Sequence, residues 1–153
     1  MQRFRFRLAT LMKLRKEVRN ARRTELNRAD EAAAALAAQR TAVAARIEGL
    51  TRHVRGAVGP GTIDLEPMIQ AQRYQAVLQA ERQALDDQMV VVAEEIERRR
   101  AAVVVADREV RILEKLHDRQ EARHRQQELK EEIKQLDEVA ARPQRDPIGG
   151  PVA

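Results

Sequence analysis

LQAERQALDDQMVVVAEEIERRRAAVVVADREVRIL, residues 78–113, is the stretch that decides the fold. Apolar residues recur in it as two series, each spaced by seven, and the steps between the series alternate between four and three. This pattern predicts the apolar seam of a coiled coil. The first series is Leu78, Leu85 and Val92, and the second is Met89, Ile96, Val103 and Val110.

The helix that carries this seam is long. Neither Pro nor Gly interrupts residues 68–142, and a helix of that length reaches about 110 Å at its usual rise per residue. A helix with one narrow apolar stripe does not bury that stripe by itself. It therefore needs a partner helix, and the first 55 residues are the candidate.

The N-terminal part of the chain repeats the same spacing. Leu36, Val43 and Leu50 form one series, and Ile47 and Val54 form the other. The residues between them are rich in Ala, which has the highest helix propensity and permits close approach of two helices. We predict one helix over about 4–55. The alternative is a solvated Ala-rich helix without a partner.

A turn separates the two helices. Gly56, Gly59, Pro60 and Gly61 are the strongest turn signal in the chain. Either Thr62 or Asp64 is suited to cap the second helix, and a short connection makes the two helices antiparallel neighbours.

The predicted fold is all-α: an antiparallel two-helix coiled-coil hairpin over residues 1–142. We expect the first helix at about 4–55, the turn at 56–64, a longer second helix at about 65–142 and a disordered tail at 143–153. Folding about the centre of the turn places Arg7 near residue 110 and Leu36 near residue 82. The hairpin then stops near Leu116, and residues 117–142 extend beyond the first helix.

Composition narrows the function. Charged residues make up 35% of the chain and aromatic residues only 2%, as is typical of coiled coils. The absence of Cys excludes disulfides and thiolate metal sites, and no apolar run is long enough to span a membrane. Residues 1–56 hold 14 Lys and Arg and 5 Asp and Glu, a net charge of +9, whereas residues 57–153 carry −4. The basic end is suited to nucleic acid, anionic lipid or an acidic protein surface.

The chain contains no motif of catalysis or cofactor binding, so we expect a binding or assembly protein that is not an enzyme and uses no cofactor. His117, Glu121 and His124 share one helix face at a spacing that permits metal binding, but a lone helix supplies no fourth ligand. The tract Arg98-Arg99-Arg100 has no accompanying aromatic residue, and we interpret it as a solvated face with ion pairs.

Three landmarks, in order, resemble a known family. The chain opens with FRFRL at residues 4–8, followed by Leu11 and Leu14-Arg15; it continues with LEKL at residues 113–116; and it ends with QLDE at residues 135–138. Their order and spacing resemble the flagellar export protein FliJ family from residue 4 to residue 142. The resemblance implies a soluble component of the flagellar type III export apparatus with an antiparallel coiled coil similar to that of the rotary-ATPase γ subunit.

The resemblance also implies partners and site residues. The partners would be the hexameric export ATPase, whose assembly the family promotes, the cytoplasmic domain of the export gate at the membrane, and export chaperones. The implied ATPase-binding residues are Phe4, Phe6, Arg7, Leu8, Leu11, Arg15, Leu113, Glu114, Leu116, Leu136, Asp137 and Glu138. The implied gate-binding residues are Tyr74, Leu78, Glu81 and Leu85.

Other functions remain open from the sequence. The first alternative is the equivalent stalk protein of a virulence secretion system. The second is a basic coiled coil that binds nucleic acid through its basic N-terminus, or a membrane surface with Phe4, Phe6 and Leu8 inserted and the arginines on lipid headgroups. For the leading hypothesis we expect a cytoplasmic protein, peripheral at the cytoplasmic face of the inner membrane, with no specific nucleic-acid partner.

Overall fold

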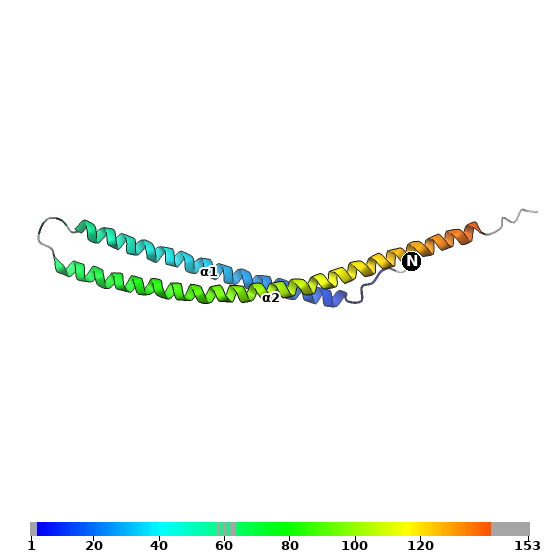
Figure 1. Cartoon of the computed structure of the whole chain (residues 1–153), viewed down its shortest axis with the longest axis horizontal. Helices are drawn as coiled ribbons and strands as arrows, with labels where there is room; N and C mark the ends of the chain where they lie inside the picture. Colours follow the sequence, from blue (N-terminus) through cyan, green and yellow to red (C-terminus); the bar gives the residue numbers. More distant parts are fainter. Residues whose placement is uncertain (1–2, 58, 60, 62–63, 142–153) are drawn as a thin grey trace, which may run out of the picture.

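The computed structural model describes residues 3–57, 59, 61 and 64–141. They form a hairpin of two long helices, α1 (Ala9–Ala57) and α2 (Leu65–Ala140), which lie side by side and run antiparallel (Figure 1). The predicted all-α hairpin with a longer second helix is confirmed. The predicted tail, residues 143–153, lies outside the described residues.

Each helix contributes an apolar stripe, and the two stripes pack together as the seam of the hairpin. The buried residues of α2 are all members of the predicted spacing or of its continuation, and the largest cluster joins Val43 of α1 to Leu78 and Leu85 of α2. Among the described residues, Leu78 and Val110 have no exposed surface and Val43 has 3%, and few others are buried because two helices cover each other on one side only. The buried residues are Ala29, Val43, Leu78, Leu85, Ile96, Ala106, Val110 and Leu113.

The ends of α2 follow from local chemistry. The Asp64 side chain caps the helix by accepting a 3.2 Å hydrogen bond from the backbone N–H of Glu66, which satisfies one of the donors left free at a helix start. At the other end the N–H of Ala141 donates to the carbonyl oxygen of Asp137 at 2.8 Å. Asp64 is one of the two caps that the sequence allowed, and the helix ends at Ala140, close to the predicted end at about residue 142.

The predicted start of α1 is wrong. The helix begins at Ala9, and residues 3–6 are not helical. Phe4 and Phe6 are two residues apart, so a helix would point them to different faces, whereas an extended chain points both to the same side. Both rings pack against α2, and this contact favours the extended form over the helix.

The predicted register is also wrong, by one to two helical turns. Arg15 Nη1 pairs with Glu109 Oε2 at 2.9 Å, and Leu36 lines a shallow groove with Asp87 and Val92. Residue 109 therefore faces Arg15 rather than the region of Arg7. The prediction centred the turn on Gly59, but α1 continues to Ala57 and α2 begins only at Leu65, which moves the centre along the chain.

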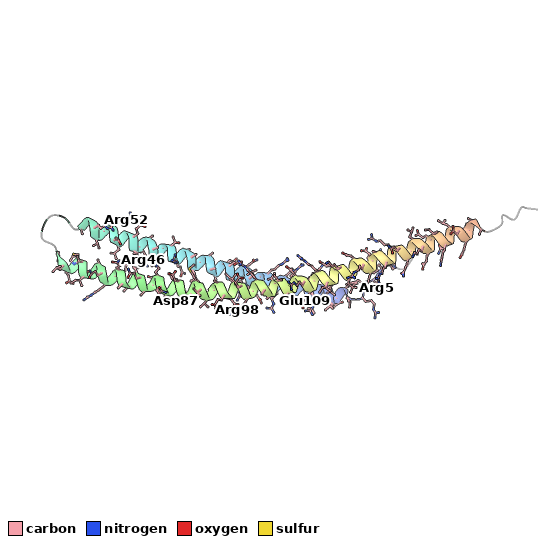
Figure 2. All side chains as sticks on the ribbon, viewed as in Figure 1. Arg5, Arg46, Arg52, Asp87, Arg98 and Glu109 are labelled. Carbon is pink, nitrogen blue, oxygen red and sulfur yellow. The ribbon has the colours of Figure 1, made fainter. Side chains whose placement is uncertain are left out.

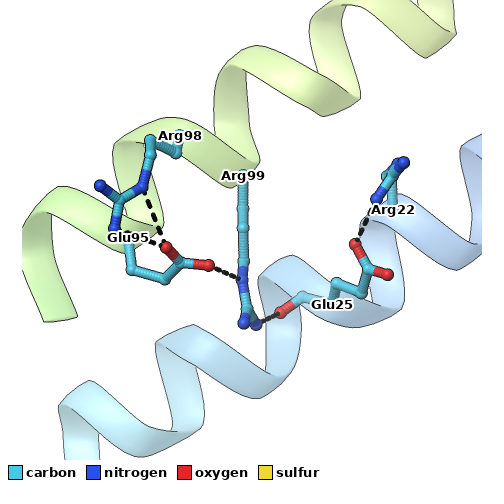
Figure 3. Close-up of polar contacts among 5 residues, drawn as sticks. All are labelled: Arg22, Glu25, Glu95, Arg98 and Arg99. Carbon is cyan, nitrogen blue, oxygen red and sulfur yellow. Dashed lines mark hydrogen bonds and ion pairs between the residues drawn. The ribbon is translucent and has the colours of Figure 1, made fainter.

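Arginine side chains also enter the seam between the helices: Arg19 of α1, whose Nε is buried, and Arg99 of α2. Arg99 Nε donates to Glu95 Oε1 at 2.7 Å, and its Nη1 reaches across to the backbone carbonyl oxygen of Glu25 at 2.6 Å (Figure 3). Glu95 also binds Arg98, and Arg100 pairs with Glu97. The arginine tract is thus a paired face, as predicted, with one member turned toward α1.

Candidate partner-binding site

The end of the hairpin that carries the N-terminus is built from two elements. Residues 3–8, which we call the N-terminal strap, leave the start of α1 and run along α2 (Figure 1). The Phe4 ring lies 5.5 Å from the His117 ring and 5.7 Å from the His124 ring, and the Phe6 ring lies 5.1 Å from His117, all measured between centroids. Edge-to-face contacts at these distances stabilise the strap on α2.

The strap extends the packed region beyond its predicted end. From the sequence, we expect the seam to stop near Leu116 because Gln120, His124 and Gln127 are poor core residues. Gln127 is exposed, but Gln120 and His124 are half-buried, since the two Phe rings of the strap replace the missing helix. The imidazoles serve as flat packing partners rather than as buried polar groups.

The strap and α2 together form a shallow basic pocket. Arg3 and Arg5 on the strap and Arg123 on α2 lie around it, together with His124. Arg5 stands at the N-terminal end of the hairpin in Figure 2. The pocket concentrates positive charge without an acidic residue in its lining, so it is suited to an anionic group.

The other residues predicted to bind an ATPase at this end differ in burial and in ion pairing. Leu8 of the strap and Leu11 of α1 are exposed, whereas Leu113 of α2 is buried. Arg15 and Glu114 are engaged in ion pairs between the helices, Arg15 with Glu109 and Glu114 with Lys16, and Leu116 is half-buried. Leu113 therefore supports the site and does not form its surface.

The C-terminal part of α2 is a single helix with an apolar stripe. Leu129, Ile133 and Leu136 are spaced by four and three and are about half or more exposed, with 57%, 49% and 68% of each residue accessible. Asp137 and Glu138 are exposed next to them. The structure places these residues on the overhang, apart from the strap, so the predicted ATPase-binding set divides into two surfaces.

The predicted gate-binding set also divides. Tyr74 and Glu81 are exposed, and both contact Arg46 of α1: Arg46 Nη2 donates to the Tyr74 hydroxyl at 2.7 Å and its Nη1 lies 3.4 Å from Glu81 Oε2. Leu78 is fully buried and Leu85 nearly so. The two leucines pack against α1, and any partner at this face would meet Tyr74, Arg46 and Glu81.

Sequence reasoning missed His117, His124 and Arg46 as parts of these surfaces. The signal for the two histidines is the alternation of Arg and Phe at residues 3–7, because alternation is typical of an extended segment with one apolar side. Arg46 gives no signal in the sequence, since its pairing with Tyr74 depends on the register of the two helices.

A cluster of possible metal ligands lies on α2, and its members differ from the predicted group of His117, Glu121 and His124. Ligand atoms of His117, Asp118 and Glu121 lie within 4.8 Å of one another, but all three belong to one helix, and no residue of α1 joins them in the described part of the chain. His124 pairs instead with Glu128 at 3.5 Å. These contacts are those of a charged helix face.

Taken together, a paired rod, a single-helix extension and a strap with exposed arginines define an interaction protein of the coiled-coil class. No helix among the described residues is long and apolar enough to cross a membrane.

The model of the family described as "Flagellar FliJ protein" matches residues 4–146. The chain therefore belongs to the FliJ family. Membership of this family makes it a component of the flagellar export apparatus. No match was found among curated proteins or solved structures.

Proposed function

We propose that this chain is the central rod of the flagellar export ATPase, and that the end carrying the N-terminal strap enters the ATPase ring. Family membership supports a role in the export apparatus. The observation that carries the proposal is the strap itself. Phe4 and Phe6 hold it on α2, and this position brings Arg3 and Arg5 together with Arg123 at the end of the rod.

The shape and charge of this end suit a ring. Two packed helices form a rod about 20 Å wide, which needs no large core to stay folded. The basic pocket at the strap complements acidic side chains of a partner, and such complementarity raises the association rate more than the affinity. Phe4, Phe6, Arg7, Leu8 and Leu11 are the strap and α1 residues we assign to ATPase contact.

The overhang is assigned to a second contact. Leu129, Ile133 and Leu136 form an apolar face on a helix without a neighbour, and such a face is recognised by an apolar groove. We assign this surface, with Asp137 and Glu138, to the ATPase or to an export chaperone. Arg15, Glu114 and Leu113 lie on the side of the strap that faces the turn, where they hold α2 against α1.

For the export gate we restrict the contact to the exposed residues. Tyr74 and Glu81 remain assigned to it, and Arg46 joins them because it binds both side chains. Leu78 and Leu85 hold α2 against α1 beneath this face. Contact with the gate would place the protein at the cytoplasmic face of the inner membrane.

Analytical ultracentrifugation of the flagellar ATPase from the same genome tests the proposal. The full chain should shift the ATPase from monomer toward hexamer and sediment with it. The double variant Phe4→Ala/Phe6→Ala should lose this shift, and Leu65→Ala, exposed at the opposite end of the rod, should keep it. An ATPase whose sedimentation is unchanged by the full chain would contradict the proposal.

The basic coiled coil that binds nucleic acid is the remaining alternative. Its support is the same group of arginines, Arg3, Arg5 and Arg123. An affinity for duplex DNA that falls steeply with salt and does not depend on base sequence would favour this alternative. The ultracentrifugation experiment distinguishes the two functions, because only the proposed rod changes the sedimentation of the ATPase.

A further inference from the structure

The basic pocket at the strap brings together three guanidinium groups from two elements. Arg3 and Arg5 of the strap and Arg123 of α2, which we call the pocket arginines, all line it. They are far apart in the sequence and meet only because the strap runs back along α2. The pocket is shallow, and its volume of about 490 Å³ lies in the range of small-molecule sites.

The carboxylates near the pocket on α2 do not neutralise the pocket arginines. Glu121 pairs with Arg125 at 2.6 Å, and Glu128 lies 3.5 Å from His124. Within the described part of the chain, none of the pocket arginines forms an ion pair with a carboxylate. Because like charges repel each other, holding three guanidinium groups around one pocket costs free energy, and an anion between them would offset that cost.

The strap is held in place by contacts that do not depend on its charge. The Phe4 ring packs on the rings of His117 and His124, and the Phe6 ring packs on His117. These aromatic contacts oppose the repulsion between the strap arginines and α2. The pocket is therefore assembled before a ligand arrives, which lowers the cost of binding one.

We propose that this pocket binds a phosphate group, either as free phosphate or as the headgroup of an anionic lipid. A carboxylate carries one charge and matches one guanidinium fork, whereas a phosphate monoester carries about −1.5 to −2 and has three strong acceptor oxygens. Three arginines match this charge and geometry better than they match a carboxylate. Gln120 and Gln127 also line the pocket, and their amide groups are further donors.

A bound phosphate would tie the strap to α2, because Arg3 and Arg5 would reach it from the strap and Arg123 from the helix. A ligand that binds only the docked strap stabilises the docked strap by the same free energy. The proposal goes beyond the role in export proposed above, because it concerns the free chain and does not involve the ATPase.

Isothermal titration calorimetry with inorganic phosphate, at an ionic strength held constant with sodium chloride, measures the binding. We expect one site with a Kd of about 1 mM or below. Arg123→Gln should raise the Kd by about tenfold or more, since it removes hydrogen bonds to a charged group. Arg111→Gln is the matched control, because this exposed arginine lies about 18 Å away along α2, and it should leave the Kd unchanged.

The variant Phe4→Ala/Phe6→Ala tests whether the strap builds the site, because it keeps every charge of the chain. Its Kd for phosphate should rise by about fivefold or more, with the helical content measured by circular dichroism unchanged. A Kd equal to that of the native chain would overturn the proposal, and so would an equal loss of affinity in Arg123→Gln and Arg111→Gln.

Co-sedimentation with vesicles distinguishes the two sources of the phosphate group. Binding to phosphatidylcholine vesicles that contain phosphatidic acid, lost without phosphatidic acid and in Arg123→Gln, would identify a lipid headgroup as a ligand. Binding of inorganic phosphate alone would identify a free phosphate compound. A chain that binds neither would overturn the proposal.

The coupling to the strap is measured by trypsin cleavage after Arg7, which does not line the pocket. Phosphate should slow this cleavage severalfold relative to sodium chloride of the same ionic strength, and the effect should be absent in Arg123→Gln. Phosphate that binds the chain without slowing the cleavage would contradict a ligand that joins the strap to α2.

Discussion

Arg99 of α2 donates a 2.6 Å hydrogen bond through Nη1 to the backbone carbonyl oxygen of Glu25 in α1 (Figure 3). The Arg99 side chain is two-thirds buried and stands where the seam would otherwise be apolar, between Ile96 and Val103. A polar residue at one seam position fixes the register of a coiled coil, because any shift leaves its donors without acceptors. Arg99 thus contributes, together with the ion pairs between the helices, to the register in which α1 and α2 face each other.

Replacing Arg99 with Met should loosen the register and not the fold. We expect the free energy of unfolding to stay within about 1 kcal/mol of the native value or to rise, because apolar replacements of partly buried charges are often neutral or stabilising. Spin labels attached at Asn27→Cys and Ala101→Cys report the distance between the two helices by electron paramagnetic resonance. The distance distribution should be narrow when Arg99 is present and broader with Arg99→Met. A distribution that stays narrow would show that other contacts set the register; Arg98→Met is the matched control.

Glu95 should contribute to a pH-dependent part of the stability. Hydrogen bonds from Arg98, and next from Arg99, lower the pKa of Glu95 below its ordinary value of 4.5. A group whose pKa is lower in the folded state stabilises the fold above its ordinary pKa and loses this effect as the pH falls through the lowered value. Chemical unfolding of Glu95→Gln should therefore differ from the native chain at neutral pH and converge with it in acid. A difference that stays constant with pH would refute this, and Glu94→Gln is the control.

Leu78 should be a structural residue. Leu78→Ala should lower the free energy of unfolding by about 3 kcal/mol, because it removes a fully buried side chain from the cluster with Val43 and leaves a cavity. Leu129→Ala makes the same change on the overhang at an exposed position and should cost less than about 0.5 kcal/mol. Urea unfolding followed by circular dichroism measures both. Equal effects would mean that the seam is not the core.

The strap should be held by its aromatic contacts. In Phe4→Ala/Phe6→Ala, and also in His117→Ala, trypsin should cleave after Arg5 and Arg7 faster than in the native chain, because the strap leaves α2 more often. The stability of the hairpin should change by less than about 1 kcal/mol, since the strap lies at its end. His53→Ala, at an exposed position of α1, is the control. Unchanged cleavage rates would show that the rings do not hold the strap.

Sequence periodicity predicted the hairpin because each seam uses local, regularly spaced residues. Leu36, Val43 and Leu50 on one helix and Leu78 and Leu85 on the other needed no tertiary information. The register was not predicted, because it depends on where the helices end around the turn and on contacts such as that of Arg99 with Glu25. These contacts join residues far apart in the chain.

The candidate site was predicted only in part, for two physical reasons. The strap residues can form either a helix or an extended chain. Contacts with the rings of His117 and His124, which are distant in sequence, favour the extended chain. The gate-binding set combined exposed Tyr74 with buried Leu78, since a spacing of four on a helix does not distinguish the edge of a seam from its centre.

ATP hydrolysis by the flagellar ATPase of the same genome is the most direct test of the proposed role. The assay compares the enzyme alone, with the full chain, and with a chain lacking residues 1–8, which leaves both helices intact. Stimulation by the full chain that is lost in the shortened chain is the predicted result. Hydrolysis that does not respond to the full chain, or responds equally to both, would contradict the account of the strap as the end that enters the ring.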